Sequence, residues 1–370
     1  MVKILDKGRK IAIYCSDVSG AFDRVSTTRL LAKLGAKGIH PDIIRVIGSW
    51  LESRRASVVV GGARSEPYLI KDMVYQGTVL GPPLWNMFFE DAAEAIKECM
   101  FEEIVYADDL NAYKEFPGTT ANENAMIAVD RVQDELHHWG KANQVKFDPS
   151  KESKHVLSRT DPFGANFKLL GIEYDCRLCM ADAVRSLVGK TRWKLRMLLR
   201  AKRFYNLEDL MIQYKQQILS FVEYRTPAVY HATSTVLAQI DRLQGSFLRE
   251  VGVSGEDALL HFNLAPLWTR GDIALLGLLH RSAIGEGAPQ FHELFKRRPG
   301  SLRLVDSLES GNTSLLLRRS IWGLVGVYNK LGNALSCKNV KGFEFLLQER
   351  VKRVVTGDLL ADWAKLYSPR

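Results

Sequence analysis

The sequence has few of the features that would place a protein in a membrane or outside the cell. Its longest stretch without Asp, Glu, Lys or Arg covers residues 73–89 and contains Gln76, Gly77 and two adjacent prolines. A membrane-spanning helix needs about 20 mainly apolar residues and would not carry these helix breakers. The first ten residues, MVKILDKGRK, lack the apolar run and the cleavage site of a signal peptide. We therefore expect no transmembrane segment and an intracellular protein, in the nucleus or the cytoplasm.

Cysteine is scarce, and its spacing gives no disulfide framework. The 370 residues include five cysteines, which are expected to be reduced inside a cell. Cys176 and Cys179 form a single CxxC pair, without a second pair or histidines at zinc spacing. We interpret both as packing or surface thiols. The sequence also lacks internal repeats and low-complexity tracts, and its composition is that of an ordinary globular protein.

Positive charge is present, but in only one half of the sequence. Residues 1–180 carry 23 Lys and Arg against 25 Asp and Glu, a net charge of −2, whereas residues 181–370 carry 28 against 17, a net charge of +11. Nucleic acid is the commonest polyanion that an intracellular protein meets. The second half is therefore predicted to bind nucleic acid, with a solvated basic face as the alternative.

Residue periodicity predicts mixed α and β structure up to about residue 180 and mainly helices beyond it. Charge and composition change at the same point, so we place the domain boundary there. The expected strands cover residues 10–15, 56–60, 146–157 and 167–174, with a hairpin at 102–113. The expected helices cover residues 26–34, 41–51, 83–99, 120–141, 185–204, 207–223 and 227–251.

Three acidic residues lie at expected strand ends. Asp17 ends the first strand, and Asp108 and Asp109 occupy the tip of the hairpin. Carboxylates gathered in this way are costly unless they hold a cation, and Mg²⁺ prefers hard oxygen ligands. Two such ions, about 3.5–4 Å apart, stabilise the attacking and leaving oxygens of a phosphoryl transfer. Each Asp alone is more often a turn or cap residue, so only the combination favours a metal site.

Four segments in order resemble the palm motifs of reverse transcriptases, in the style of non-LTR retrotransposons. They are DVSGAFDRV (17–25), YQGTVLGPPLWN (75–86), YADD (106–109) and FKLLGI (167–172). PLWTRGDIALLGLLHR (266–281) resembles the region that follows the palm in such elements. The resemblance implies an α+β fold, with a polymerase palm built on an antiparallel core sheet in residues 1–180. A basic, mainly helical, thumb-like region would follow in residues 181–370.

The resemblance also implies roles for single residues around a metal site. Asp17 and Asp108 match the two metal-ligating aspartates, and Asp109 matches their neighbour, which supports the site. Lys151 lies where the family often carries a lysine near the triphosphate, a candidate proton donor to the pyrophosphate leaving group. Lys154 is a rival for this role, and a plain surface lysine is the alternative for either.

Three further residues match positions that contact the nucleotide in the family. Phe22 matches the bulky residue under the incoming sugar, where a ring would collide with a 2′-hydroxyl. Gln76 and Gly77 match the loop that lies against the templating base and the nucleotide. Glycine suits such a loop because it permits close backbone approach. A buried phenylalanine and a plain turn are the structural alternatives.

The stretch 185–203 contains eight Lys or Arg and no acidic residue. On a helix it would present a positive face, with Trp193, Leu195, Met197, Leu198 and Leu199 as the packed side. A thumb helix that follows a phosphate backbone needs such a face, and its binding should depend strongly on salt. The expected nucleic-acid-binding residues are Arg192, Lys194, Arg196, Arg200, Lys202 and Arg203.

Together, these matches imply an RNA-directed DNA polymerase that uses an RNA template, a DNA primer and deoxynucleotides. Two Mg²⁺ ions, or Mn²⁺ as a substitute, would be the cofactors. About sixteen residues precede Asp17, whereas the family carries fingers motifs upstream, so we expect an N-terminally truncated element with its fingers largely missing. One alternative is a non-catalytic nucleic-acid-binding remnant. Another is a metal-dependent nuclease, for which no separate motif exists.

Overall fold

The computed structural model describes residues 1–52, 54–308 and 315–355. The chain divides into two compact units. We call residues 7–165 the sheet unit, and residues 1–6 with 166–370 the helical unit. The α+β prediction is confirmed, since an antiparallel sheet region is followed by a mainly helical region.

The division between the units lies between Ala165 and Asn166, and not near residue 180 as the sequence indicates. The segment 167–174, expected as one strand, is a small hairpin of β9 (Phe167–Leu169) and β10 (Ile172–Tyr174). β10 packs against α6 (Ala181–Arg200), and the Tyr224 hydroxyl donates a hydrogen bond to the Leu170 carbonyl, 2.8 Å away. These contacts place the FKLLGI motif in the helical unit.

A four-stranded antiparallel sheet forms the centre of the sheet unit. The strands run in the order β6, β7, β1, β8, so β1 lies between two partners, as its run of strand-forming residues predicts. The β1–β7 register runs from Lys10 opposite Phe116 to Asp17 opposite Asp109. The strands are β1 (Lys10–Asp17), β6 (Glu102–Tyr106), β7 (Asp109–Phe116) and β8 (Ser153–Leu157).

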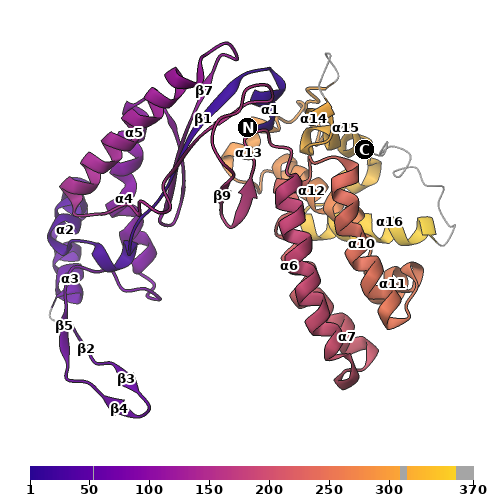
Figure 1. The fold of residues 1–370 in the computed structure, drawn as a ribbon, viewed down its shortest axis with the longest axis horizontal. Coiled ribbons are helices and arrows are strands. Elements are labelled where there is room, and N and C mark those ends of the chain that lie inside the picture. The colour runs from indigo at the N-terminus through magenta and orange to yellow at the C-terminus, as the bar shows by residue number, and fades with distance from the viewer. Residues whose placement is uncertain (53, 309–314, 356–370) are drawn as a thin grey trace. The chain divides into compact units, whose positions relative to one another are not determined.

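Helices cover one side of this sheet. Figure 1 shows α4 (Gly81–Glu98) and α5 (Asn122–Asn143) side by side along it, and α5 contacts both β1 and β8. Their aromatic residues form the centre of the core: Trp85 stacks on Phe89 with ring centroids 4.8 Å apart, and Phe89 meets Trp139 edge to face at 5.4 Å. Two further helices follow β1 in the chain: α2 (Thr27–Ala36) packs against α4, and α3 (Pro41–Leu51) packs against α2.

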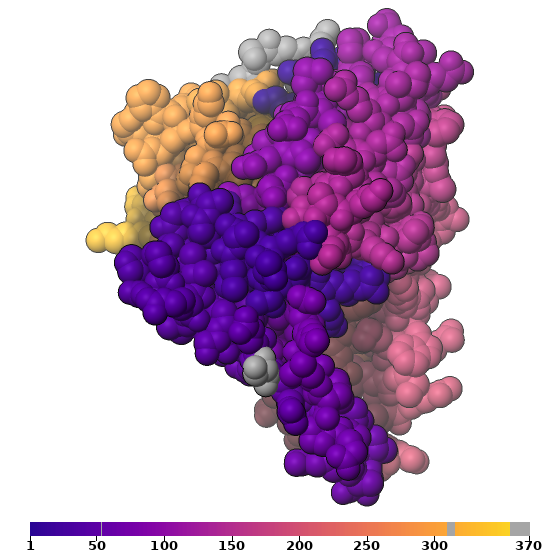
Figure 2. Space-filling model, turned by 90° about the vertical axis from the view of Figure 1, so that its left-hand side faces the viewer, coloured from indigo at the N-terminus to yellow at the C-terminus, as the bar shows by residue number. Residues whose placement is uncertain are grey.

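A narrow β-ribbon extends from the sheet unit beyond α3. It contains two short antiparallel pairs, in place of the single strand expected at residues 56–60. Most of its side chains are exposed, and Figure 2 shows the segment projecting from the body of the unit. The pairs are β2 (Arg54–Ala56) with β5 (Tyr68–Ile70) and β3 (Val59–Val60) with β4 (Ala63–Arg64).

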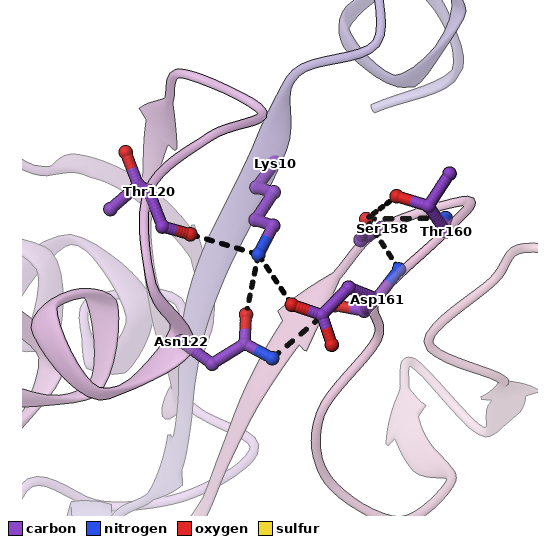
Figure 3. A network of polar contacts seen from close by, with 6 residues as sticks. All are labelled: Lys10, Thr120, Asn122, Ser158, Thr160 and Asp161. Atoms are coloured by element: carbon purple, nitrogen blue, oxygen red, sulfur yellow. Dashed lines mark hydrogen bonds and ion pairs between the residues drawn. The ribbon is translucent and has the colours of Figure 1, made fainter.

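A buried lysine fixes the first residue of β1 (Figure 3). The Lys10 ammonium donates to the Thr120 carbonyl at 2.8 Å, to Asn122 Oδ1 at 2.9 Å and to Asp161 Oδ2 at 2.7 Å. A lysine has three N–H donors, so each of them has an acceptor and the charge is paired. The network therefore fixes the N-terminal end of β1, whereas Asp17 lies at its C-terminal end.

The helical unit is built around α6, α10 (Ser234–Val251), α12 (Leu267–Ile284) and α16 (Val340–Val355). None of the helices in the described part of the chain is long and apolar enough to cross a membrane. The remaining helices and helical turns among the described residues are α1 (Val2–Asp6), η1 (Ala21–Arg24), η2 (Lys202–Phe204), α7 (Leu207–Tyr214), η3 (Lys215–Leu219), α8 (Ser220–Glu223), α9 (Thr226–Val229), α11 (Gly255–Phe262), α13 (Pro289–Leu294), α14 (Leu315–Arg318), η4 (Ile321–Gly323), α15 (Leu324–Asn329) and η5 (Gly332–Ser336).

Candidate active site

The last residue of β1 and the first residue of β7 bring two carboxylates together. Asp17 and Asp109 are directly opposite each other in the antiparallel register, a position in which Cα atoms are about 4.5–5.5 Å apart. The Asp17 side chain is 16% exposed, and Asp109 is half-buried. The sheet itself therefore determines the spacing of this pair.

The third carboxylate lies in the turn between β6 and β7. Tyr106 pairs with Asp109, which leaves Ala107 and Asp108 as a two-residue loop. In such a loop the first of the two residues, or both, must have a positive φ. These positions usually carry Gly, Asn or Asp. Here Ala107 has a positive φ of 56°. The YADD segment thus forms the expected hairpin, and its turn places Asp108 at the same end of the sheet as Asp17.

The electrostatics of the site show mutual repulsion between these carboxylates. Burial, together with the negative charges of Asp17 and Asp108, raises the pKa of Asp109. The Lys151 ammonium lies 2.5 Å from Asp17 Oδ2, and this hydrogen bond raises the pKa of Lys151. One ammonium therefore faces three carboxylates, and the site keeps an excess of negative charge that a cation would relieve.

Backbone pairing with motif residues positions the loop that carries Lys151. The Asp148 amide donates to the Asp17 carbonyl at 2.9 Å, and the Ser19 amide donates to the Lys146 carbonyl at 2.8 Å. The sequence predicts a strand over residues 146–157, but β8 begins only at Ser153 and the preceding residues form this loop. Pairing across more than 120 positions of sequence thus brings Lys151 to the carboxylates.

The rival lysine points to a different partner. Lys154 Nζ contacts Asp130 Oδ1 on α5 at 2.5 Å. Lys154 lies on β8, where successive side chains alternate between the faces of the sheet. Of the two lysines, Lys151 contacts Asp17 and Lys154 contacts Asp130 of α5.

Phe22 and the loop after the β-ribbon form a second part of the site. The Val74 amide donates to the Phe22 carbonyl at 2.8 Å, which joins this loop to the segment that follows Asp17. Gln76 and Gly77 are exposed at its tip, and Gly77 has φ of 79°, a conformation that glycine adopts without strain. The Thr78 hydroxyl donates to the Tyr75 carbonyl at 2.7 Å and closes the turn.

The chain is also similar to known proteins. The family model described as reverse transcriptase (RNA-dependent DNA polymerase) matches residues 3–174. This part of the chain belongs to the reverse transcriptase family. The family includes RNA-directed DNA polymerases, and the relatives of this chain come from retrotransposons of the non-LTR type.

Two curated relatives match parts of this chain. The RNA-directed DNA polymerase from mobile element jockey of Drosophila funebris is 28% identical over 261 residues, which cover 64% of this chain and 28% of the relative. The retrovirus-related Pol polyprotein from the type-1 retrotransposable element R2 of Popillia japonica is 27% identical over 114 residues, 28% of this chain and 19% of the relative. The chain thus spans less than a third of the length of either relative. The structure of telomerase from Candida albicans in complex with a fragment of telomeric RNA aligns with 71% of this chain and 47% of that chain, at 13% identity and a TM-score of 0.34.

The structure shows contacts of one residue, Trp85, that the sequence did not predict. Trp85 of α4 donates a hydrogen bond from its indole nitrogen to the Ala107 carbonyl, 2.9 Å away, in the turn that carries Asp108. Its ring also stacks on Phe22, with centroids 5.5 Å apart. The only sequence signal was its place in the YQGTVLGPPLWN motif, because the contact joins positions 22 residues apart.

The donor chemistry of the domain fits Mg²⁺, although the side chains are not yet arranged around an ion. Within the three described ranges, no group of three or more His, Cys, Asp or Glu forms a site that could hold a metal ion. Asp17 instead contacts Lys151. Carboxylate oxygens are the ligands that Mg²⁺ prefers. Burial, and after it the negative charges of Asp17 and Asp108, raise the pKa of Asp109, and an ion bound here would neutralise part of that negative charge.

The basic segment of the helical unit differs in part from its prediction. Trp193 and Met197 are 63% and 47% exposed, so the expectation that they pack is wrong. The buried residues of α6 follow a narrower stripe that includes Leu195 and Leu198, which is enough for contact with α10. The predicted cations are exposed except Lys194, which is half-buried over the Phe221 ring; Lys202 and Arg203 lie in η2, beyond the end of the helix.

Proposed function

We propose that the chain is an RNA-directed DNA polymerase whose sheet unit carries out the chemistry. The primer 3′-hydroxyl attacks the α-phosphorus of a deoxynucleotide, a new phosphodiester bond forms, and the bond to pyrophosphate breaks. The observation that supports this reaction is the register that sets Asp17 opposite Asp109, with Asp108 in the adjoining turn. Such a cluster of carboxylates at a sheet end suits nucleotidyl transfer with divalent cations.

Asp17 and Asp108 are the residues that would hold two Mg²⁺ ions, or Mn²⁺, with Asp109 supporting their geometry. When bound, such ions lower the pKa of the attacking hydroxyl and neutralise the developing negative charge on the phosphate oxygens. In this structure, Lys151 partly neutralises Asp17 instead. Binding therefore requires Lys151 to move away from Asp17 Oδ2.

Lys151 then acts as the general acid in this proposal. Its side chain is largely exposed and lies on a loop, so it is free to turn from Asp17 toward a triphosphate. An exposed lysine is protonated at neutral pH with or without Asp17, which is the state needed to donate a proton to departing pyrophosphate.

Phe22, Gln76 and Gly77 select and position the nucleotide. Phe22 is half-buried and its ring is supported from behind by Trp85. A supported ring excludes a 2′-hydroxyl by collision more effectively than a mobile one. The exposed Gln76 and the backbone of Gly77 offer polar contacts to the nucleotide and the templating base.

The helical unit supplies the nucleic-acid contacts in this proposal, in the role of a polymerase thumb. Arg192, Arg196 and Arg200 recur at every fourth position of α6, so they lie along one line on the helix surface. The exposed Trp193 and Met197 lie beside this line. Cations give affinity for phosphates, and an exposed aromatic ring adds packing on sugars or bases. The expected ligand is the RNA template paired with its DNA primer.

Primer extension tests the proposal directly. The full chain is given an RNA template, a DNA primer, deoxynucleotides and Mg²⁺ or Mn²⁺, with Asp108→Ala as the matched variant. Extension by the unaltered chain that Asp108→Ala abolishes is the expected result. Absence of extension under both metals, or extension that survives Asp108→Ala, would overturn it.

A second candidate function is nucleic-acid binding without polymerisation. The observation that favours it is the basic face of α6, which lies in a different unit from the carboxylates and does not depend on them. Salt-sensitive binding of the same template and primer, with no extension and no metal-dependent cleavage, would support this function. Metal-dependent cleavage of the template would point to a nuclease instead.

A further inference from the structure

We propose that Trp85 is a positioning residue that links nucleotide selection to the turn carrying Asp108. Its indole N–H fixes the Ala107 carbonyl, and its ring supports Phe22. The second half of this inference rests on the proposed polymerase function. The first half concerns the structure of the turn and stands without it.

The hydrogen bond is built into the core of the sheet unit. The Trp85 side chain is only 1% exposed, and its indole nitrogen is a donor without acceptor capacity. A buried donor that loses its partner is costly. The Ala107 carbonyl, 2.9 Å away, satisfies the indole, so the position of α4 and the conformation of the turn depend on each other.

The turn has a particular need for such support. Ala107 has φ of 56°, in a region that side chains with a Cβ atom rarely adopt. A residue in this conformation persists when its surroundings determine it. A hydrogen bond to the Ala107 carbonyl fixes the plane of the peptide between Ala107 and Asp108. The direction in which the Asp108 side chain leaves the backbone follows from that plane.

The opposite side of the same residue contacts Phe22. The Trp85 ring stacks on Phe22 at 5.5 Å with an interplanar angle of 26°, and on Phe89 at 4.8 Å with an angle of 23°. Gly81, one helical turn before Trp85, leaves room for this arrangement: a Cβ atom there would lie 2.8 Å from the Tyr75 carbonyl oxygen and 3.6 Å from the Phe22 ring. Trp85 is thus in direct contact with both Phe22 and the turn.

Two variants distinguish a positioning role of Trp85 from simple packing in the core. Trp85→Phe keeps an aromatic ring for stacking, and it removes the N–H donor together with one ring of the indole. Trp139→Phe is the matched control, because Trp139 is also buried in this core and donates its indole N–H at the same 2.9 Å, but to Asp91. Both variants lose one indole hydrogen bond, and only Trp85→Phe loses it at the turn.

Hydrogen–deuterium exchange of the full chain, without metal or nucleotide, tests the structural half. Trp85→Phe should speed exchange of amides in the 104–111 hairpin about tenfold, the usual effect of removing one hydrogen bond on a local opening. Trp139→Phe should leave that hairpin unchanged. Unchanged exchange in Trp85→Phe, or an equal increase in both variants, would overturn the inference.

Primer extension with deoxynucleotides and ribonucleotides tests the link to selection. Trp85→Phe should lower kcat about tenfold and preserve discrimination against ribonucleotides, because Phe22 keeps its support. Trp85→Leu should lower kcat and also reduce discrimination severalfold. Equal discrimination in both variants would overturn the link. If the unaltered chain extends no primer, the proposed function fails and the link to selection fails with it, while the exchange measurement still decides whether Trp85 fixes the turn.

Discussion

The two units of the protein use charge in opposite ways. The sheet unit carries 20 Lys and Arg against 22 Asp and Glu, and it places lysines such as Lys10 and Lys33 in contact with carboxylates inside or beside the core. The helical unit carries 31 against 20, and much of its excess is exposed on α6 and η2. The first arrangement concentrates negative charge at one sheet end; the second spreads positive charge over a surface.

Under the proposed function, this difference corresponds to chemistry in the sheet unit and nucleic-acid binding in the helical unit. A local cluster of carboxylates is worth most where a cation and a reacting phosphate meet it in a partly dry site. A line of exposed cations gives affinity without selecting a reaction. Changes in one unit should therefore affect one property and spare the other, and four predictions test this separation.

The largest effect is expected from Asp17→Asn. This change keeps the shape of the side chain and removes the charge that would hold a metal ion, so extension should fall on the order of a thousandfold. Binding of the template–primer duplex should change less than about twofold, because α6 is untouched. Asp23→Asn, an exposed Asp six positions further along the same motif, is the control and should keep its extension rate. A comparable loss of duplex binding in Asp17→Asn would contradict the separation.

The second prediction concerns the stability of the sheet unit at low pH. Burial lowers the pKa of His155 to about 4, whereas the unfolded chain has the ordinary value of about 6.5. The unfolded state therefore binds the extra proton between these values, and the free energy of unfolding should fall as the pH drops from about 6.5 to about 4. The expected loss is roughly 3 kcal/mol.

Urea unfolding of the unaltered chain and of His155→Gln across this pH range measures that contribution. His155→Gln should remove the dependence between pH 6.5 and about 5, where few carboxylates titrate. The carboxylates of both proteins still protonate near pH 4, so the difference between the two curves is the relevant quantity. Parallel curves would show that His155 does not stay neutral in the folded unit.

The third prediction separates the two roles of Lys151. Lys151→Met should lower extension about a hundredfold through loss of the general acid, and it should also bind Mn²⁺ more tightly in the absence of nucleotide, because Asp17 loses its competing ammonium. Electron paramagnetic resonance of Mn²⁺ measures the second effect. Lys154→Met, which removes the same charge three residues away, should alter neither quantity. Weaker Mn²⁺ binding in Lys151→Met would contradict the competition.

Local signals in the sequence were enough for the central elements of the fold. The β1 run and the paired apolar segments around YADD predicted the strands, and the acidic turn between them followed directly. The helices at 27–36, 41–51 and 81–98 start near Ser, Pro or Gly positions that such patterns mark. The meeting of Asp17 with Asp108 and Asp109 was predicted from the motif order, and it depends on a register that alternation of apolar residues alone does not determine.

Long-range contacts account for what the sequence did not predict. Lys151 and Lys154 are three positions apart, and only pairing of the 146–148 segment with the end of β1 distinguishes them. The contact of Trp85 with Ala107 has the same character. On α6, helical periodicity offered more apolar positions than the neighbouring helices cover, so Trp193 and Met197 were assigned to the wrong side. The hairpin at 167–174 joined the helical unit because of its packing on α6.

The smallest effect on extension is expected from the basic face. Changing Arg192, Arg196 and Arg200 together to Ala should lower the slope of log binding constant against log salt by up to about three, close to one for each phosphate that is no longer neutralised. Extension at saturating duplex should stay nearly constant, since the carboxylates lie in the other unit. The control removes the same charge from Lys330, Lys338 and Lys341, which are exposed elsewhere in the helical unit. If affinity follows net charge alone, both triple variants will bind the duplex equally weakly. If the line along α6 is the binding surface, only the arginine variant will change the salt slope. The sheet unit will keep its catalytic rate in that variant.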